Sequence, residues 1–214
     1  LIAILCDVEH VQEVLPTVLV CNERTIPEKE YAALKAAMPP NVFLLRQRSA
    51  WSSTALTVYT IKLLGVALGP FMEQYTPLLS FDAAKIHIPA AVFAACRRAR
   101  LLPLLIAASL TYALQPLDIR AFHPFKIQVQ KEYQAFRLRT PGGVVSLQDW
   151  LASVCTAIRV VLRGRPWARA FDSAGFAANQ VGISEHTLAL LGFTEPVQVG
   201  AGRPFVEQLR SCFP

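Results

Sequence analysis

The sequence has few charged residues and no clustered metal ligands, and both features narrow the classes of protein that it can encode. Charged residues make up 17% of the 214 residues, and hydrophobic residues make up 53%. This composition excludes wholesale disorder and supports one substantial domain with a buried core. The five cysteines form no C-x-x-C pair and no cluster with histidine, which argues against a zinc site. Because their number is odd, a disulfide framework is also disfavoured, and we expect reduced thiols.

Uninterrupted apolar runs of membrane-spanning length are also missing. The run 54–71 contains Lys62 and ends in Gly-Pro, and the run 101–114 is short and contains Pro103. A spanning helix needs about 20 apolar residues, so we interpret both runs as buried core elements and expect no membrane partner. The alternative, a small membrane protein, rests only on the mean hydropathy of +0.37. No signal peptide is recognised.

Positive charge is concentrated in one part of the chain. Eight Lys and Arg but only two acidic residues lie between Arg97 and Arg139, whereas the remainder holds 13 of each sign. This segment therefore carries the whole net charge of +6. A localised basic stretch suits a polyanion such as DNA, although an ordinary solvated helix face would have the same composition.

Short apolar runs alternate with longer helical patterns, which predicts a mixed α/β domain. The chain begins with the apolar run Leu1–Leu5, which we interpret as part of a strand in an N-terminally truncated domain. Pro124 is expected near the start of a helix or at a kink in it. Strands are predicted at 1–6, 17–21, 42–45, 77–81 and 102–107, and helices at 27–38, 52–68, 89–100, 119–136 and 147–162, followed by short helices and loops.

Two aspartates occupy settings that suit chemistry. Asp82 closes an apolar strand and is followed five residues later by His87, and Asp118 follows the next predicted strand at the mouth of a basic helix. A carboxylate at the end of a buried strand has a rigid support from which it can hold a divalent cation. The spacing of 36 positions between the two leaves room for one helix and one strand, so the side chains could converge. Alternatively, each aspartate merely caps a following helical turn.

Several motifs in this region resemble those of pogo-like DDE-type transposases. Phe81–His87 (FDAAKIH) resembles their D-[N/S]-x-x-x-H motif, and Leu110–Asp118 (LTYALQPLD) resembles L-T-x-x-L-Q-P-L-D. His123–Lys126 (HPFK) is similar to the family's K-P-F-K, with a tyrosine downstream at Tyr133. The motifs occur in the family's order over roughly residues 1 to 180.

The resemblance implies a ribonuclease H-like domain, with a mixed sheet flanked by helices, at 1–139 and a helical extension at 140–214. It implies DNA as the partner and two-metal phosphoryl transfer, with Mg²⁺ or Mn²⁺ held by three carboxylates. Asp82 and Asp118 would be the second and third carboxylates and metal ligands, and His87 would be a further catalytic residue. A nuclear location and self-association are compatible with the family, and no small-molecule substrate is expected.

The match is incomplete at two positions. The family's first carboxylate lies on a preceding strand that this chain lacks, unless Asp7 or Glu9 replaces it, and Ala83 stands where Asn or Ser is usual. We therefore expect the chain to be inactive and to bind the metal only weakly, although the intact parent would be an endonuclease. The alternative hypothesis is a domesticated, non-catalytic module with the same fold that binds DNA or protein.

Nucleic-acid contacts need only positive charge and reach. The residues predicted to contact phosphates are Lys85, Arg120, Lys126 and Lys131. The three tryptophans, Trp51, Trp150 and Trp167, are predicted to pack in the interior and not to stack on bases.

Overall fold

The computed structural model describes residues 1–176 and residue 189. Its fold is mixed α/β, as the alternation of apolar runs predicts. The predicted short helices and loops after residue 176 lie outside the described residues, apart from Ala189. The helices and strands, with 3₁₀ and π turns marked η, are α1 (Glu9–Gln12), β1 (Thr17–Asn22), α2 (Glu28–Ala36), β2 (Val42–Gln47), α3 (Thr54–Leu68), η1 (Gly69–Phe71), β3 (Leu78–Asp82), α4 (Ala90–Arg98), β4 (Leu102–Ile106), η2 (Ala108–Leu110), α5 (Thr111–Leu114), η3 (Leu117–Ala121), α6 (Phe122–Arg139), η4 (Pro141–Gly143), α7 (Leu147–Ala157), η5 (Ile158–Arg163) and α8 (Ala168–Ser173).

The four strands form two separate parallel pairs. β1 pairs with β2 from Thr17 opposite Val42, and β3 pairs with β4 from Leu78 opposite Leu102. A helix lies between the two strands of each pair, α2 in the first and α4 in the second, because parallel neighbours need a crossover connection. The four strands lie where the apolar runs predict them.

The predicted strand at 1–6 does not form as such. It makes one isolated antiparallel bridge, between Ile2 and Val18, in which each residue's N–H donates to the other's carbonyl at 2.8–2.9 Å. Beyond the bridge, the buried side chain of Gln12 replaces a neighbouring strand: its amide bonds the Ile4 carbonyl and the Cys6 N–H at 3.2 and 2.5 Å. The prediction of a strand at 1–6 was therefore wrong. The Gln12 side chain, and not a neighbouring strand, forms the hydrogen bonds to Ile4 and Cys6.

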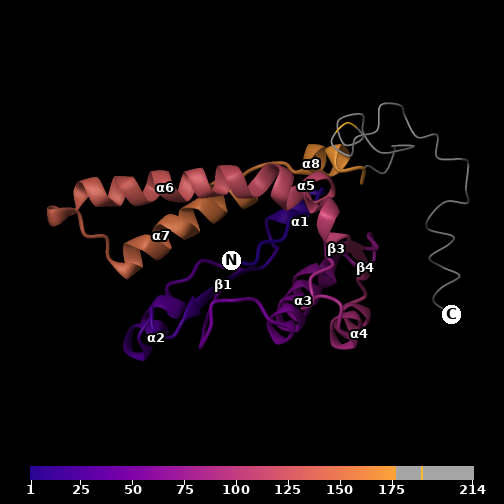
Figure 1. Ribbon diagram of the computed structural model, residues 1–214, viewed down its shortest axis with the longest axis horizontal. Coiled ribbons are helices and arrows are strands. Elements are labelled where there is room, and N and C mark those ends of the chain that lie inside the picture. The colour runs from indigo at the N-terminus through magenta and orange to yellow at the C-terminus, as the bar shows by residue number, and fades with distance from the viewer. Residues whose placement is uncertain (177–188, 190–214) are drawn as a thin grey trace, which may run out of the picture.

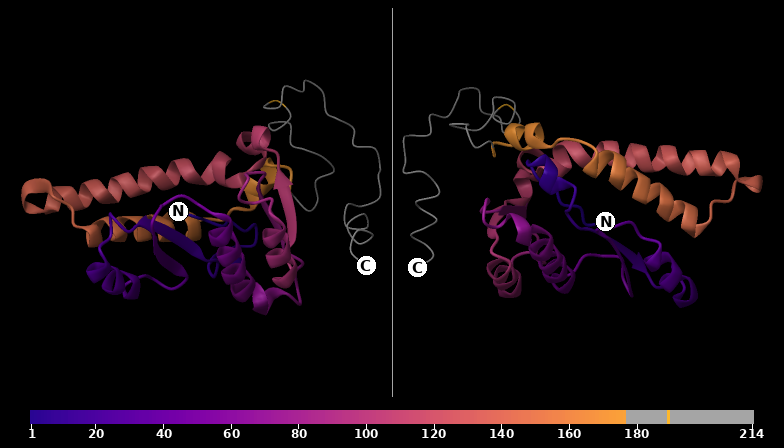
Figure 2. Two further views of the ribbon diagram at one scale, coloured as in Figure 1. Left: turned by 60° about the horizontal axis from the view of Figure 1, so that its bottom comes forward. Right: turned by 180° about the vertical axis from the view of Figure 1, so that it is seen from behind.

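The first core cluster lies between the β1–β2 pair and the C-terminal helices. Leu19 of β1 and Leu44 of β2 pack with Phe125 of α6. Leu151 of α7 and Ile158 of η5 belong to the same cluster. α6 and α7 run as a long hairpin across the top of Figure 1, and the views in Figure 2 show the same arrangement. Residues on both sides of the predicted boundary at 139/140 thus share one core.

The second core cluster lies between α3, α4 and the β3–β4 pair. Ile61, Leu64 and Leu68 of α3 are buried against Val92 and Cys96 of α4. Within the described residues, the stretch Thr54–Phe71 is the one helix long and apolar enough to cross a membrane by length and composition. In this fold, one face of α3 packs in the second cluster.

The helix predicted from residue 119 begins earlier and is irregular at its start. A π-helical turn, η3, runs directly into α6, and Pro124 lies in the first turn of α6. Because proline has no N–H to donate to the residue four positions earlier, an irregular turn at this point is the expected adjustment.

The described cysteines, Cys6, Cys21, Cys96 and Cys155, are all free. Burial raises the pKa of each thiol, to about 11 at Cys6. Because the thiolate is the reactive form, raised pKa values make these cysteines poor nucleophiles. Cys212 lies outside the described residues.

The contact between α3 and α4 predicts a pair of contrasting variants. A Cβ added at Gly65 would lie 2.8 Å from the Cβ of Ala99, whereas one added at Gly69 would meet nothing within 4 Å. We expect Gly65→Ala to lower the free energy of unfolding by about 1–2 kcal/mol, since α4 must shift. Gly69→Ala should lower it by less than about 1 kcal/mol, because the added Cβ meets no neighbour and only the αR conformation before Pro70 opposes it. Urea unfolding measures both, and equal effects would contradict the close packing.

Candidate functional site

Asp82 lies at the C-terminal end of β3, where the parallel pair holds its backbone in place. It is the last residue of the ladder, opposite Ile106, and the next N–H, from Ala83, donates to the Ile106 carbonyl at 2.8 Å. The side chain is 37% exposed. The carboxylate is therefore carried by a rigid strand and still reaches solvent, as the strand-end pattern in the sequence predicts.

His87 contacts Asp82 directly. Its Nδ1 lies 2.5 Å from Asp82 Oδ1 and 3.0 Å from the Asp82 carbonyl oxygen. A tight turn brings the two together, in which the His87 N–H donates to the Ala84 carbonyl at 2.8 Å, and Phe81 packs on the ring with centroids 5.2 Å apart. A neutral ring that donates from Nδ1 keeps the lone pair of Nε2 available to bind a metal or accept a proton.

Asp118 lies in the first turn of η3, not before it. Its N–H donates to the Gln115 carbonyl at 3.0 Å, and the helix is preceded by Pro116, without a side-chain cap. The alternative interpretation of Asp118 as the N-cap of a helix starting at Ile119 was therefore wrong. The Asp82 carboxylate, in turn, is hydrogen-bonded to the ring of His87, the other residue of its sequence motif.

Both aspartates line one cavity of about 430 Å³, here called the aspartate cavity. His87 lines it as well, and α3 contributes Thr57 and Thr60. Burial raises the pKa of the Asp118 carboxyl, the negative charge of Asp82 raises it further, and the ammonium of Lys126 lowers it. The charge of Asp82 therefore acts on Asp118, although the two residues are 36 positions apart in the sequence.

A third acidic ligand is missing from the aspartate cavity. Asp7 and Glu9, the alternative first carboxylates, do not line it, because the N-terminal segment contributes only Leu1–Leu5. Within the described part of the chain, no group of three or more His, Cys, Asp or Glu side chains could hold a metal ion. Asp82, His87 and Asp118 therefore do not form a three-ligand group, and the two aspartates are one acidic residue short of a three-carboxylate centre.

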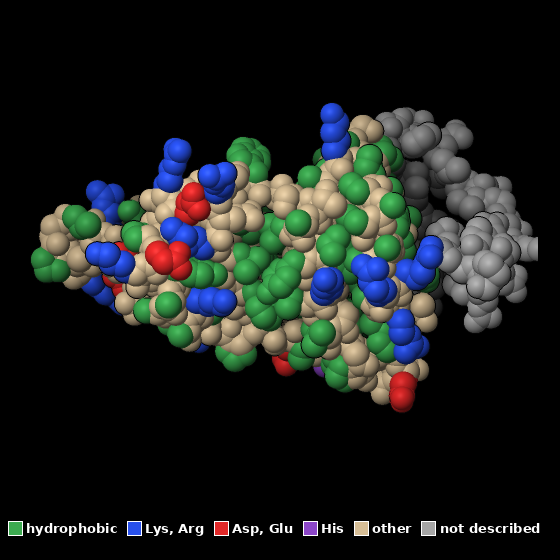
Figure 3. Space-filling view, turned by 90° about the horizontal axis from the view of Figure 1, so that it is seen from below, with side chains coloured by type: hydrophobic (Ala, Val, Ile, Leu, Met, Phe, Trp, Pro, Cys, Tyr) green, Lys and Arg blue, Asp and Glu red, His purple; other side chains and the backbone are tan. Residues whose placement is uncertain are grey.

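The four predicted phosphate-contacting residues are all exposed: Lys85, Arg120, Lys126 and Lys131. Lys126 is the one of the four whose charge lowers the pKa of Asp118. Seen from below the view of Figure 1, Lys and Arg side chains are spread toward both ends of the face, and hydrophobic side chains gather between them (Figure 3).

The tryptophan predictions held for only part of the set. Trp167 is buried, and its Nε1–H donates to the Leu162 carbonyl at 2.9 Å. Trp51 is 84% exposed, so the prediction that it packs in the interior was wrong. Its neighbours in the sequence, residues 49–53, are small, and they form no helix or strand that could cover it.

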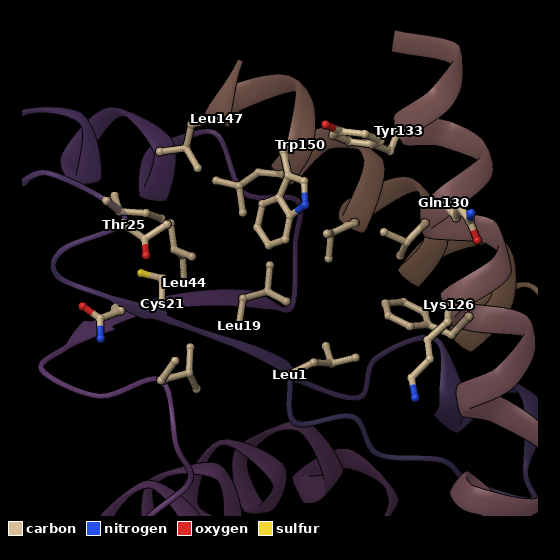
Figure 4. Close-up of a pocket in the computed structure, with 18 residues that line it drawn as sticks. Leu1, Leu19, Cys21, Thr25, Leu44, Lys126, Gln130, Tyr133, Leu147 and Trp150 are labelled. Carbon is tan, nitrogen blue, oxygen red and sulfur yellow. The ribbon is translucent and has the colours of Figure 1, made fainter. Parts of the chain in front are cut away.

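A second cavity, of about 610 Å³, lies between β1 and the α6–α7 hairpin. Trp150, 43% exposed, lines it together with Leu19, Val129 and Tyr133 (Figure 4). Sequence reasoning missed this cavity because it depends on how two helices lie on a sheet, which no local pattern encodes.

Comparisons with family models, curated proteins and solved structures found no match to this chain.

The electrostatic coupling predicts how the titration of Asp118 responds to its neighbours. Asp82→Asn removes a negative charge and should lower the pKa of Asp118, whereas Lys126→Met removes a positive charge and should raise it. Lys131→Met, further along α6, is the matched control and should leave it unchanged. Carboxyl ¹³C NMR measures the three titrations, and an unchanged pKa in Asp82→Asn would contradict a shared cavity.

Proposed function

We propose that this chain is a partial ribonuclease H-like domain of the pogo-like DDE transposase kind, without its first strand, whose intact parent performs phosphoryl transfer on DNA. The observation that carries the proposal is the convergence of Asp82 and Asp118 in one cavity, with His87 bonded to Asp82. The motifs that contain these residues are the ones that resemble the family. Support for the fold comes from a parallel pair whose strand ends in the aspartate, followed by a helix that carries the other.

Each residue has a role that follows from its surroundings. Asp82 and Asp118 would hold Mg²⁺ or Mn²⁺, and His87 orients the Asp82 carboxylate through Nδ1. The positive charge of Lys126 favours the ionised form of Asp118, which is the form that binds a cation. When bound, the cation would supply Lewis-acid activation at a phosphate. With two carboxylates present, we propose weak metal binding and no catalysis by this chain.

DNA is the proposed partner, and the nucleus is the proposed location. The support is the excess of Lys and Arg between Arg97 and Arg139, together with the exposure of Lys85 and Lys131. Positive side chains that reach solvent can neutralise backbone phosphates without reading the sequence.

A second candidate is a domesticated module that binds DNA or protein and has lost the chemistry. Two observations favour it over an active enzyme. No third acidic side chain lines the aspartate cavity within the described residues, and Ala83 offers only a methyl group beside Asp82. The two candidates share the fold and differ in whether a metal ion binds.

Manganese binding tests the site. Millimolar Mn²⁺ should broaden the NMR signals of His87 and its neighbours, because a paramagnetic ion held by Asp82 and Asp118 lies close to them. The double substitution Asp82→Asn with Asp118→Asn should abolish the broadening, and Asp7→Asn, outside the cavity, should preserve it. Broadening that persists in the double variant, or none in the wild type, would argue for the non-catalytic module.

Duplex DNA binding tests the partner. Lys85→Met and Lys131→Met should each weaken binding and reduce the slope of log K against log salt concentration by about 1, since each removes one phosphate contact. Lys29→Met is the matched control, because Lys29 is an exposed lysine on α2, outside the basic segment. Fluorescence anisotropy at several salt concentrations measures the slopes. Equal losses in all three variants would reveal only a general charge effect.

A further inference from the structure

The cavity between β1 and the α6–α7 hairpin, here called the hairpin cavity, has walls made from the first core cluster. Its volume of about 610 Å³ lies in the range of small-molecule sites in proteins, about 300–1,000 Å³. Leu19, Leu44 and Leu151 line it, and none of them is more than 7% exposed. An apolar ligand inside would therefore contact the core itself, and the burial of its surface would stabilise the complex.

α6 adds a row of polar side chains to the hairpin cavity. Lys126, Gln130 and Tyr133 line it, and their spacings of four and three residues place them on one face of the helix. None of the three side chains forms a hydrogen bond or a salt bridge to another described residue. The ammonium, the amide and the hydroxyl are therefore available to a ligand.

α7 adds one more available donor. Figure 4 shows the indole of Trp150 directed from α7 toward the strands. Its N–H forms no hydrogen bond to a described residue, whereas the indole N–H of Trp167 donates to the Leu162 carbonyl. Tryptophan commonly combines an apolar contact surface with one polar group that bonds a partner, so Trp150 suits the wall of a ligand site.

The polar groups of β1 in the same cavity are already paired within the protein. The Cys21 thiol donates to the Leu45 carbonyl at 3.1 Å. The Asn22 side chain donates to the Arg48 carbonyl and accepts from the Arg24 N–H. Polar recognition in the hairpin cavity therefore comes from the helices, and β1 contributes mainly apolar contact.

The side-chain charge of the hairpin cavity has one sign. Lys126 lines it, and no Asp or Glu does. Because Lys126 is exposed, its ammonium lies where an ionised ligand group can keep part of its hydration. A hydrogen bond from an ammonium to a carboxylate is stronger than one between neutral groups, whereas a cationic ligand would meet only repulsion.

We propose that the hairpin cavity binds a small amphiphilic carboxylate of the fatty-acid kind. The apolar chain lies against Leu19, Leu44 and Leu151, and the carboxylate lies at the rim, where Lys126 and its neighbours on α6 donate hydrogen bonds to it. A mostly apolar cavity with a few placed polar groups is the usual form of a small-molecule site. The site is separate from the aspartate cavity and from the chemistry proposed there.

The probes are decanoate and decylammonium, which carry the same chain with opposite charge. Both are added below micelle-forming concentrations to the full chain, and methyl and indole NMR signals are followed. Decanoate should shift the signals of Leu19, Val154 and Trp150, with a dissociation constant below about 1 mM for a ligand of this size. Val92 is buried in the second cluster, outside the cavity, and should not respond. Decylammonium should bind at least about 10-fold more weakly.

A charge reversal tests the role of Lys126. Lys126→Glu should reverse the preference, so that decylammonium binds more tightly than decanoate. Lys131→Glu is the matched control, because it changes the net charge equally at an exposed position of α6 that does not line the cavity; it should keep the preference for decanoate. Lys126→Met, which retains an apolar stem, should weaken decanoate binding about 10-fold.

Three results would overturn the proposal. They are equal affinity for both probes in the original chain, an unchanged preference in Lys126→Glu, and shifts at Val92 as large as those at Leu19 and Val154. The outcome is independent of the proposed function, because amphiphile binding is read from signals of the hairpin cavity, whereas the transposase proposal is read from manganese and DNA.

Discussion

The packing of the N-terminal segment between two core clusters is the constraint on which the described fold depends. Ala3 and Leu5 pack against the first cluster, whereas Ile4 and Cys6 pack against the second. An extended segment whose side chains alternate in this way acts as a shared layer between two cores. Gln12 fixes it in place, since a buried amide that bonds both Ile4 and Cys6 satisfies groups that would be costly to leave unpaired.

This shared layer also shapes the candidate site. Leu79 and Phe81 of β3 pack with the second cluster, and Leu117 and Ala121 of η3 pack with the first, so Asp82 and Asp118 come from elements that pack in different cores. Both line the aspartate cavity, to which the N-terminal segment and β3 also contribute lining residues. The burial that raises the pKa of Asp118 and its coupling to Asp82 follow from this geometry.

Local patterns in the sequence predicted much of the fold and part of the site. The strands ending at Asp82 and near Ile106 were predictable because short apolar runs bounded by turns have few alternatives. The five-residue offset singled out His87 as a candidate, but its hydrogen bond to Asp82 depends on the tight turn between them and was not predicted. The failures arose where tertiary contacts decide: Gln12 replaces a strand beside residues 1–6, a π turn advances the helix that carries Asp118, and Trp51 remains exposed. None of these depends on the periodicity of the neighbouring residues.

The separation of the Asp82 and Asp118 carboxylates, measured in a crystal structure of the full chain, tests the convergence most directly. Two carboxylates that serve one metal centre, with ions about 3.5–4 Å apart, must lie within about 8 Å of each other. We predict a separation below that limit, with the His87 ring still on Asp82. Carboxylates directed to different edges of the molecule would contradict the shared site and leave a mixed α/β domain without the proposed chemistry.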